Sequence, residues 1–370
     1  MSPADRMPRA DRILLVLPSL ERGGGERVLL QLARSFLAEG REVHLAVLLG
    51  GGPLRGEVPD TAVLHELLHA DHAARGFWLA WRAFPKLASL MRAIKPSAVL
   101  STMTGTNLLT ALACRRARVD PRLVLREAAS LVNVKNPLKF LMMRWFYPRA
   151  TELVAVSTGI ARELHRLGLA ENRIHVIHNP VDSERLRRLA ANDLPVKLRD
   201  KTPYVISIGR LAEQKDQQTL LRAYASSPLR QSHRLIIVGE GDQRPYLEQL
   251  SRDLGIDDRL LLPGAMDNPY PVLAGASLHV LSSRWEGYPN VLLEALALGV
   301  PVVSSDCPHG PRELLDDGRH GRLAPISDAN ALAAAMSDEL AQPSPGREKV
   351  VASHEPKKIA SCYLSLLDGQ

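Results

Sequence analysis

The chain has 370 residues, of which 45% are hydrophobic and 24% are charged, and its formal net charge is +7. This length allows two domains of ordinary size, and the composition excludes a chain that is disordered by default. No apolar run approaches the roughly 18 residues that a membrane-spanning helix needs, and the charged start of the sequence is unlike a secretory signal. We therefore expect a soluble protein, or one that sits on a membrane surface.

The three cysteines, Cys114, Cys307 and Cys362, are odd in number and far apart. Their spacing matches neither a zinc site nor a disulfide framework. Such cysteine usage suits a reducing cytosol, so we expect a cytoplasmic protein.

Short aliphatic runs alternate with helical patterns in the first half of the chain. The runs predict buried strands at residues 12–19, 43–49, 98–102, 123–127, 153–157 and 174–178. After the first run come the glycines Gly23–Gly25 and a predicted helix over residues 26–40, with Leu29 and Phe36 on its apolar face. Continuous apolar strands joined by helices indicate a parallel sheet that is covered on both faces.

The pattern starts again after a seam near residues 178–202, which contains the segment NPVD (179–182). A second series of strands is predicted at residues 204–209, 234–239, 259–264, 278–283 and 301–306. We expect an α/β protein with two Rossmann-like, doubly wound domains, residues 1–178 and 179–354, and a C-terminal helix over 355–370 that packs back on the first. Ligands of such sheets bind beyond the carboxyl ends of the strands, so functional residues should follow each strand directly.

Charge is distributed unevenly between the two halves. Residues 1–180 carry 25 Lys and Arg against 15 Asp and Glu, whereas the remainder carries 22 against 25. A basic first half suggests an anionic surface or acceptor for that half, although a merely solvated basic face explains it too. Nucleic acid is a weaker explanation, because only 4% of residues are aromatic and no recognition-helix, zinc-finger or RNP-like pattern is present.

The stretch SSRWEGYPNVLLEALALGVPVVSSD carries the most chemical information. Glu286 comes just past a predicted strand, Gly287 allows a tight turn, and Pro289 suits the first turn of a helix that contains Glu294 and ends at Gly299. Two carboxylates that frame a helix N-terminus can accept hydrogen bonds from sugar hydroxyls, while the N–H groups and the helix dipole receive a phosphate. For either glutamate alone, a favourable acid in a first helical turn is the simpler interpretation.

A second motif, ISIGRLAEQKD, places Arg210 and Lys215 in a loop after a strand that ends at Gly209. The fixed donors of Arg and the mobile ammonium of Lys suit a diphosphate whose charge grows as it departs. Two isolated basic residues are more often solvated, but their position directly after a strand favours a functional role.

These motifs resemble those of the family 4 glycosyltransferases, which are retaining enzymes of the GT-B fold with two Rossmann-like domains facing each other across a cleft. The resemblance covers nearly the whole chain, from the glycine run through NPVD, GRLAEQKD and IVGEGDQR to EGYPNVLLEA. Its specific part is the E-x7-E spacing together with GR-x4-K. The segment DCPHGPREL (306–314) also resembles members that build cell-surface polysaccharide, lipopolysaccharide core or lipid-linked oligosaccharide.

The resemblance implies a nucleotide-sugar donor site in the second domain and an acceptor site in the first. In the implied catalytic set, Arg210 and Lys215 bind the diphosphate and Glu286 binds the donor hexose, while Glu294 binds the ribose. Asn290 and Val291 would offer backbone N–H groups to the β-phosphate. The full set of implied donor-binding residues besides Arg210, Lys215 and Glu286 is Gly23, Gly24, Gly209, Glu240, Gly264, Asn268, Gly287, Asn290, Val291 and Glu294.

One position departs from the family pattern. Many relatives have a histidine after the glutamate that ends a first-domain strand, whereas here Glu127 is followed by Ala128. We therefore name no catalytic base. Arg126 and Glu127 are candidates for the acceptor side, with an ion pair at the strand end as the alternative, and Thr104 and Asn107 should border the same site.

The stretch 136–150, NPLKFLMMRWFYPRA, combines large apolar residues with Lys139, Arg144 and Arg149. It could lie in an anionic inner leaflet and receive a lipid-linked acceptor. For the apolar residues we expect instead a core helix packed under the strand at 153–157, and a functional role for the basic rim.

The function implied by the resemblance is transfer of a hexose or N-acetylhexosamine from a UDP-sugar to a glycan or lipid-linked acceptor, with retention of configuration, at the inner face of the cytoplasmic membrane. No metal is expected, because no DxD motif follows a donor strand and Asp316–Asp317 read as solvated loop acids. The alternatives are a nucleotide-sugar epimerase of the same fold and a non-catalytic nucleotide-sugar or anionic-lipid binding protein. A dinucleotide dehydrogenase is disfavoured because the first loop reads ERGGGER instead of G-x-G-x-x-G.

Overall fold

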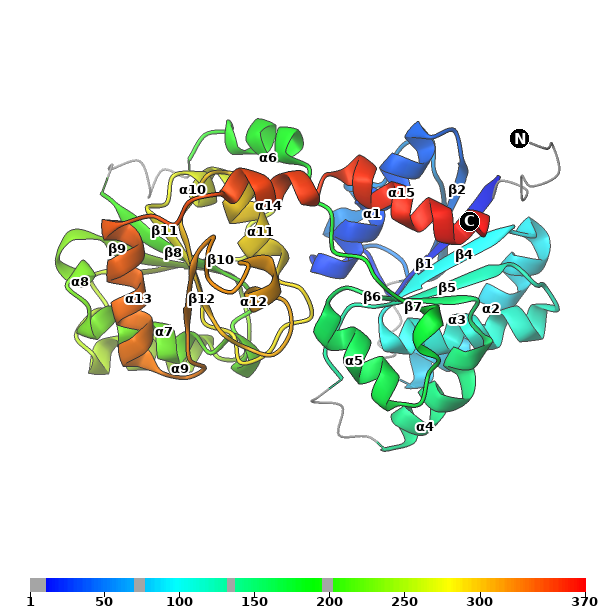
Figure 1. Cartoon of the computed structure of the whole chain (residues 1–370), viewed down its shortest axis with the longest axis horizontal. Coiled ribbons are helices and arrows are strands. Elements are labelled where there is room, and N and C mark those ends of the chain that lie inside the picture. Colours follow the sequence, from blue (N-terminus) through cyan, green and yellow to red (C-terminus); the bar gives the residue numbers. More distant parts are fainter. Residues whose placement is uncertain (1–10, 70–76, 132–136, 195–201) are drawn as a thin grey trace. The chain divides into compact units, whose positions relative to one another are not determined.

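The computed structural model describes residues 11–69, 77–131, 137–194 and 202–370. The start of the chain, Asn136 and part of the polar seam therefore lie outside the described residues. The chain divides into two units, Met1–Pro180 with Pro356–Gln370, and Val181–Glu355 (Figure 1). The sequence analysis expects the first division after residue 178 and the C-terminal helix from residue 355.

The first unit is built on a parallel sheet of seven strands in the order β3-β2-β1-β4-β5-β6-β7. Its strands are β1 (Arg12–Leu17), β2 (Glu42–Leu49), β3 (Val63–Leu68), β4 (Ala98–Thr102), β5 (Arg122–Glu127), β6 (Glu152–Ala155) and β7 (Ile174–Val176). Its helices are α1 (Gly24–Ala38), α2 (Phe77–Ile94), α3 (Thr104–Ala117), α4 (Pro137–Phe146), α5 (Thr158–Arg166) and α15 (Pro356–Asp368). The sequence reasoning missed β3 because this edge strand, VLHELL, is only partly buried and is not a continuous apolar run.

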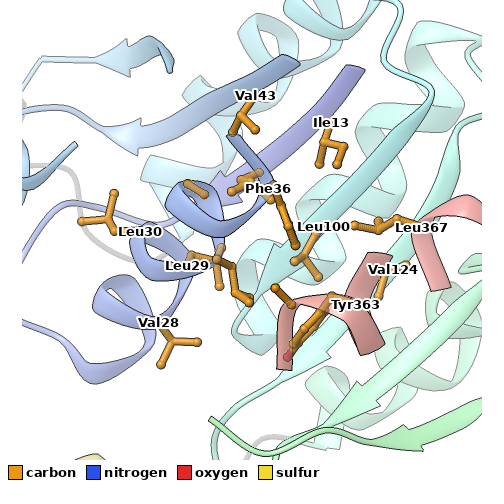
Figure 2. Close-up of a cluster of buried hydrophobic side chains, with 14 of the residues drawn as sticks. Ile13, Val28, Leu29, Leu30, Phe36, Val43, Leu100, Val124, Tyr363 and Leu367 are labelled. Carbon is orange, nitrogen blue, oxygen red and sulfur yellow. The ribbon is translucent and has the colours of Figure 1, made fainter. Parts of the chain in front are cut away.

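The C-terminal helix α15 completes the core of the first unit. It packs beside α1, and Figure 2 shows Tyr363 and Leu367 of α15 reaching the same cluster as Phe36 of α1 and Leu100 of β4. Tyr363 is fully buried and Leu367 is 1% exposed. Residues from the two ends of the chain thus share one hydrophobic core.

The second unit holds a parallel sheet of six strands in the order β10-β9-β8-β11-β12-β13. Its strands are β8 (Tyr204–Ile208), β9 (Arg234–Val238), β10 (Leu260–Gly264), β11 (Leu278–Leu281), β12 (Val302–Ser305) and β13 (Arg322–Ala324). Its helices are α6 (Ser183–Ala190), α7 (Gln217–Ser226), α8 (Leu229–Ser232), α9 (Arg244–Asp253), α10 (Tyr270–Ala274), α11 (Asn290–Ala297), α12 (Pro311–Leu314), α13 (Ala329–Ala341) and α14 (Arg347–Ser353). The three-residue strand β13 was not predicted, since it is too short to show a period.

The strand order of the second unit explains where its loops meet. The chain runs outward from β8 to β10 and then returns to place β11 on the other side of β8. The loops after β8 and β11 are therefore neighbours at the carboxyl edge of the sheet, where α/β proteins bind their ligands. The two sequence motifs with Arg210 and Glu286 lie in these loops. The expected doubly wound α/β architecture is confirmed.

The expectation of a core helix at 136–150 is wrong. Within α4 only Met143 is fully buried, while Leu138, Leu141 and Trp145 are 59%, 53% and 64% exposed. The helix carries apolar residues around most of its circumference, and its packing against α3 covers one side of it. Among the described residues, no helix is long and apolar enough to cross a membrane.

Leu367→Ala should lower the free energy of unfolding by about 3 kcal/mol, because it leaves a cavity between α15 and the sheet. Urea denaturation followed by circular dichroism would measure the change. Lys357→Ala is the matched control, since Lys357 is exposed on the same helix and its removal should cost less than about 0.5 kcal/mol. Equal and small losses for both variants would show that α15 contributes little to the core.

Candidate active site

Two loops of the second unit are joined through backbone and side-chain hydrogen bonds. The backbone N–H of Arg284 donates to the carbonyl of Gln214 at 2.8 Å, and the Gln214 amide donates to the carbonyl of Trp285 at 2.9 Å. The hydroxyl of Ser282 donates to the carbonyl of Lys215 at 2.8 Å. These bonds place the GRLAEQKD loop directly against the loop that leads to Glu286.

The centre of the site is an ion pair between Lys215 and Glu286. The Lys215 Nζ lies 2.6 Å from Glu286 Oε1, and the two side chains are 20% and 8% exposed. The same carboxylate oxygen accepts a hydrogen bond from the Ser283 hydroxyl at 2.6 Å. The structure thus brings together two predicted residues that are 71 positions apart in the chain.

The turn that follows Lys215 is held by a buried aspartate. Asp216 has a φ of +47° and is 2% exposed, which is an unusual backbone conformation for a residue with a side chain. Its carboxylate accepts hydrogen bonds from Thr219 at 2.9 Å and Ser327 at 2.7 Å, and these hold the turn. The sequence reasoning missed Asp216, although an aspartate that ends a polar loop is a known signal for this conformation.

Arg210 lies at the exposed side of the same loop. Its guanidinium donates to the Gln214 side chain at 3.4 Å, and its backbone carbonyl accepts from the Gln217 amide at 2.8 Å. The loop therefore holds an exposed cation beside the partly buried Lys215. Such a pair of cations can neutralise a diphosphate.

Helix α11 begins next to the ion pair. Pro289 stands at its N-cap, one residue earlier than the sequence suggests, and supplies no side-chain cap; Gly299, with a φ of +80°, follows the helix end. The N–H groups of a first helical turn lack partners within the helix and attract anions. Asn290 and Val291 open this turn, and Gly287 is buried in the loop before it.

Glu294 lies in the second turn of α11, and its side chain contacts helix α10. Its carboxylate accepts a hydrogen bond from the Tyr270 hydroxyl of α10 at 3.3 Å. Glu286 and Glu294 therefore have different partners, as two residues that serve different parts of one ligand would.

The glycines of the GEG motif allow the loops to approach closely. A Cβ at Gly239 would lie 1.9 Å from the backbone oxygen of Gly209, and one at Gly241 would lie 2.1 Å from that of Leu211. Glu240, between them, pairs with Arg244 at 2.8 Å. This motif shapes the β8 and β9 loops through backbone packing.

The stretch from Gly264 to Asn268, whose two end residues belong to the implied donor-binding set, is held by its own contacts. Gly264 has a φ of +88°, and a Cβ there would lie 2.8 Å from Glu240 Oε1. The Asn268 amide donates to the carbonyl of Leu189 in α6 at 2.8 Å, while its oxygen accepts from the backbone N–H of Tyr270 at 3.2 Å. Asn268 thus joins α6 to the start of α10, the helix whose Tyr270 contacts Glu294.

The candidate residues of the first unit form two groups. Gly23 is the N-cap of α1 and Gly24 its first residue; a Cβ at Gly23 would lie 1.9 Å from Glu26 Oε2, so the absence of a side chain makes room for that carboxylate. The four acceptor-side candidates are all buried at the carboxyl ends of β4 and β5: Thr104, Asn107, Arg126 and Glu127.

Glu127 joins three of these residues into a buried network. It accepts hydrogen bonds from the hydroxyls of Thr104 at 2.9 Å and Tyr147 at 2.7 Å, and the Asn107 amide donates to the Tyr147 oxygen at 3.3 Å. Burial raises the pKa of the Glu127 carboxyl, while the hydrogen bonds from Tyr147 and Thr104 oppose that shift. Tyr147, which the sequence reasoning missed, connects the segment after α4 to β5.

Arg126 has a separate set of partners. Its guanidinium donates to Thr102, Asn179 and Tyr363 at 2.7, 2.5 and 3.2 Å. Successive residues of a strand point to opposite faces, so Arg126 and Glu127 do not form the ion pair considered above. Arg126 instead ties β5 to α15 and to the end of the first unit.

Comparison with known proteins places the chain in a family. A family model described as Glycosyltransferase Family 4 matches residues 22–185, and one described as Glycosyl transferases group 1 matches residues 202–342. The lipopolysaccharide core biosynthesis glycosyltransferase LpsE of Rhizobium meliloti is 32% identical over 268 residues, which cover 68% of this chain and 77% of that protein. The chain belongs to the family 4 glycosyltransferases.

Two further proteins are similar to this family 4 glycosyltransferase. The N-acetylgalactosamine-N,N'-diacetylbacillosaminyl-diphospho-undecaprenol 4-alpha-N-acetylgalactosaminyltransferase of Campylobacter jejuni is 29% identical over 325 residues, or 85% of this chain and 86% of that enzyme. The crystal structure of Anabaena HepE in complex with UDP-glucose superposes with a TM-score of 0.72 at 20% identity, covering 97% of both chains. The second likeness concerns the fold. Among the described residues of our glycosyltransferase, no cluster of three His, Cys, Asp or Glu side chains could hold a metal ion.

His279 lies in β11, close to the ion pair, and the sequence reasoning did not single it out. Its side chain is fully buried, and burial together with the charge of Lys215 lowers its pKa to about 3. The ordinary histidine pKa is about 6.5, so a proton binds this residue far better in the unfolded chain. The folded second unit therefore contains His279 with a neutral imidazole.

Because the folded-state pKa is depressed, the stabilising contribution of neutral His279 should be complete above pH of about 6.5 and should fall by about 1.4 kcal/mol per pH unit below it. His279→Leu should flatten this decline. Urea denaturation at several pH values between neutral and mildly acidic would measure both slopes. His165→Leu, a change at an exposed histidine of α5, should leave the slope as in the wild type. An unchanged slope in His279→Leu would contradict the assignment.

Proposed function

We propose that this glycosyltransferase moves a hexose or N-acetylhexosamine from a UDP-sugar to a glycan or lipid-linked acceptor, with retention of anomeric configuration, in cell-surface polysaccharide or lipopolysaccharide synthesis. The observation that carries the proposal is the Lys215–Glu286 pair beside the N-terminus of α11. The names of the relatives support the class of acceptor, since one acts on a diphospho-undecaprenol glycan and another builds lipopolysaccharide core. The HepE complex with UDP-glucose supports the class of donor.

The donor would lie along the loops after β8 and β11. Its diphosphate meets Arg210, Lys215 and the first turn of α11, so that two cations and a helix dipole face its charge. Glu286 accepts hydrogen bonds from the hexose hydroxyls, and Ser283 holds this carboxylate in place. Glu294, on the α10 side of the helix, accepts hydrogen bonds from the ribose.

The reaction is a front-face displacement. The acceptor oxygen forms a bond to the anomeric carbon on the face from which the diphosphate leaves, while the bond between that carbon and the phosphate oxygen breaks. The acceptor proton passes to the departing phosphate oxygen, which takes the electron pair of the broken bond. Arg210, Lys215 and the α11 N-terminus stabilise the negative charge that develops on the diphosphate. We propose that these groups do so without a metal ion.

The two glutamates should respond differently to loss of charge. Glu294→Gln should weaken binding of both UDP and the whole UDP-sugar about tenfold or more, because one charged hydrogen-bond partner of the ribose is lost. Glu286→Gln should barely alter UDP binding yet depress sugar transfer, because the hexose is the only part of the donor that Glu286 is proposed to contact. Calorimetric titration with UDP and with UDP-sugars, in buffer containing EDTA, and a transfer assay would measure these effects.

Glu248→Gln serves as the matched control, since Glu248 lies in α9 and pairs with Arg244 at 2.9 Å, outside the proposed donor site. Equal losses of UDP affinity in Glu286→Gln and Glu294→Gln would reject the division of labour. Loss of all binding in EDTA, restored by magnesium, would reject the metal-independent site.

We also propose that α4 attaches the first unit to an anionic membrane surface on the cytoplasmic side, where lipid-linked acceptors reside. Leu138, Leu141 and Trp145 are more than half exposed on this helix, and exposed basic residues, Arg144 and Arg149, lie beside them. An amphipathic helix with this composition binds in the headgroup region through apolar burial and attraction to anionic lipid. The excess of basic residues in the first half of the chain agrees with binding to an anionic membrane surface.

Leu141→Ala should reduce binding to vesicles that contain phosphatidylglycerol about tenfold, because one large apolar side chain no longer enters the bilayer surface. Arg144→Gln should reduce it about fivefold, and only at low salt. Vesicle sedimentation would measure both, and UDP binding should be unaffected. Val63→Ala, at an exposed position on the edge strand β3, is the control. Wild-type protein that does not sediment with anionic vesicles would refute the membrane role.

A further inference from the structure

Tyr288 occupies the loop between Glu286 and α11 and is directed away from solvent. It is 6% exposed, its hydroxyl forms a hydrogen bond with His354 Nε2, and the two ring centroids are 5.7 Å apart. Its neighbours in sequence are Gly287 and Pro289, so a shift of Tyr288 would displace both Glu286 and the first turn of α11. The roles proposed above assign nothing to this residue.

His354 ends α14 and is 4% exposed. Its Nδ1 lies 2.6 Å from the carbonyl oxygen of Val350, so Nδ1 carries the proton and donates it to that oxygen. Nε2 is then left as an acceptor, and the Tyr288 hydroxyl is the donor. Burial raises the pKa of Tyr288 well above its ordinary value, which keeps the hydroxyl protonated.

The backbone of His354 connects the Tyr288–His354 pair to the two chain crossings, which are the places where the chain passes from one unit to the other. The carbonyl of His354 accepts a hydrogen bond from the Val181 N–H at 2.8 Å. Val181 is the first residue of the second unit, and Glu355, the residue after His354, is its last. Both chain crossings are therefore joined at His354, which in turn holds Tyr288.

The opposite side of the Tyr288 loop is fixed by the loop after β12. The Glu286 N–H donates to the carbonyl of Pro308 at 3.2 Å. Gly310, with a φ of +93°, permits close contact, since a Cβ there would lie 2.6 Å from Pro289 Cδ and 3.1 Å from Tyr288 Cα. The Tyr288–His354 contact attaches the other side of the loop to His354, whose carbonyl binds Val181.

We propose that Tyr288 and His354 are positioning residues that hold Glu286 and the first turn of α11 in place and couple donor binding to the backbone at both chain crossings. This inference rests on the donor site of the proposed function. Coupling of this kind is reciprocal: a donor that orders the Tyr288 loop also orders the crossings, and a disturbance at the crossings weakens transfer.

The test compares hydrogen exchange and transfer in matched variants of the full chain. In the wild type, UDP should slow exchange of the Val181 amide. Tyr288→Phe removes only the hydroxyl; it should still bind UDP, lose the slowing at Val181, and lower kcat about tenfold with little change in donor KM. His354→Gln keeps a hydrogen-bond acceptor near the position of Nε2. This variant should therefore retain most of the slowed exchange at Val181 and most of the wild-type kcat.

Tyr224→Phe is the control, because its hydroxyl donates to the His233 carbonyl at 2.6 Å in the same unit, at the amino end of β9, whereas the proposed donor loops follow the carboxyl ends of β8 and β11. It should change neither kcat nor exchange at Val181. The double variant Tyr288→Phe/His354→Leu leaves neither member of the pair as an unmatched polar group, so it should recover stability but not coupling. The double variant therefore distinguishes a positioning role from a purely structural role. It does so even if the single variant Tyr288→Phe folds poorly.

The outcomes separate the two proposals. Wild-type protein that binds UDP, together with a Tyr288→Phe variant that keeps both kcat and the slowed exchange at Val181, would overturn the positioning role and leave the donor site standing. Wild-type protein that binds no nucleoside diphosphate would overturn the donor site and the inference with it. Recovery of coupling by the double variant would also overturn the role of the hydrogen bond.

Discussion

The contact between Lys215 and Glu286 is the interaction on which the proposed donor site depends. It forms because the strand order places β11 beside β8, so that two loops far apart in the chain leave the sheet side by side. A partly buried ammonium and a buried carboxylate compensate each other's charge, which lowers the cost of keeping both in the site before a ligand arrives. In the proposed function, the same pair presents a cation to a phosphate and a hydrogen-bond acceptor to a sugar.

The surrounding backbone is shaped to hold that pair. Gly239 and Gly241 let the β9 loop touch the backbone of the β8 loop, at distances that no side chain would tolerate. Asp216, next to Lys215, adopts a left-handed conformation that its own hydrogen bonds stabilise. Conformations of this kind cost free energy and persist where neighbouring contacts enforce them, as they do at functional sites.

The first unit divides its polar and apolar residues in an unusual way. Arg126 and Glu127 are fully buried and hydrogen-bonded, whereas Leu138, Leu141 and Trp145 are exposed. The hydrogen bonds of Glu127 and Arg126 connect β5 with the end of β4, the start of α3, the segment after α4 and α15. They thereby hold the elements around the strand ends together. The exposed apolar side chains of α4 form the kind of surface that the proposed attachment to a membrane requires.

The sequence by itself determined the two parallel sheets, the apolar face of α1 and the residues of the GRLAEQKD and EGYPNVLLEA loops, because strand periodicity, glycine stops and motif spacing are local properties. It could not reveal the short or half-polar strands β13 and β3, whose residues lack a clear period. It also could not show which side of α4 is buried, that Arg126 and Glu127 have separate partners, or that Tyr288 meets His354. Those facts depend on residues that are distant in the chain, such as Tyr363 for Arg126, and only tertiary packing brings them together.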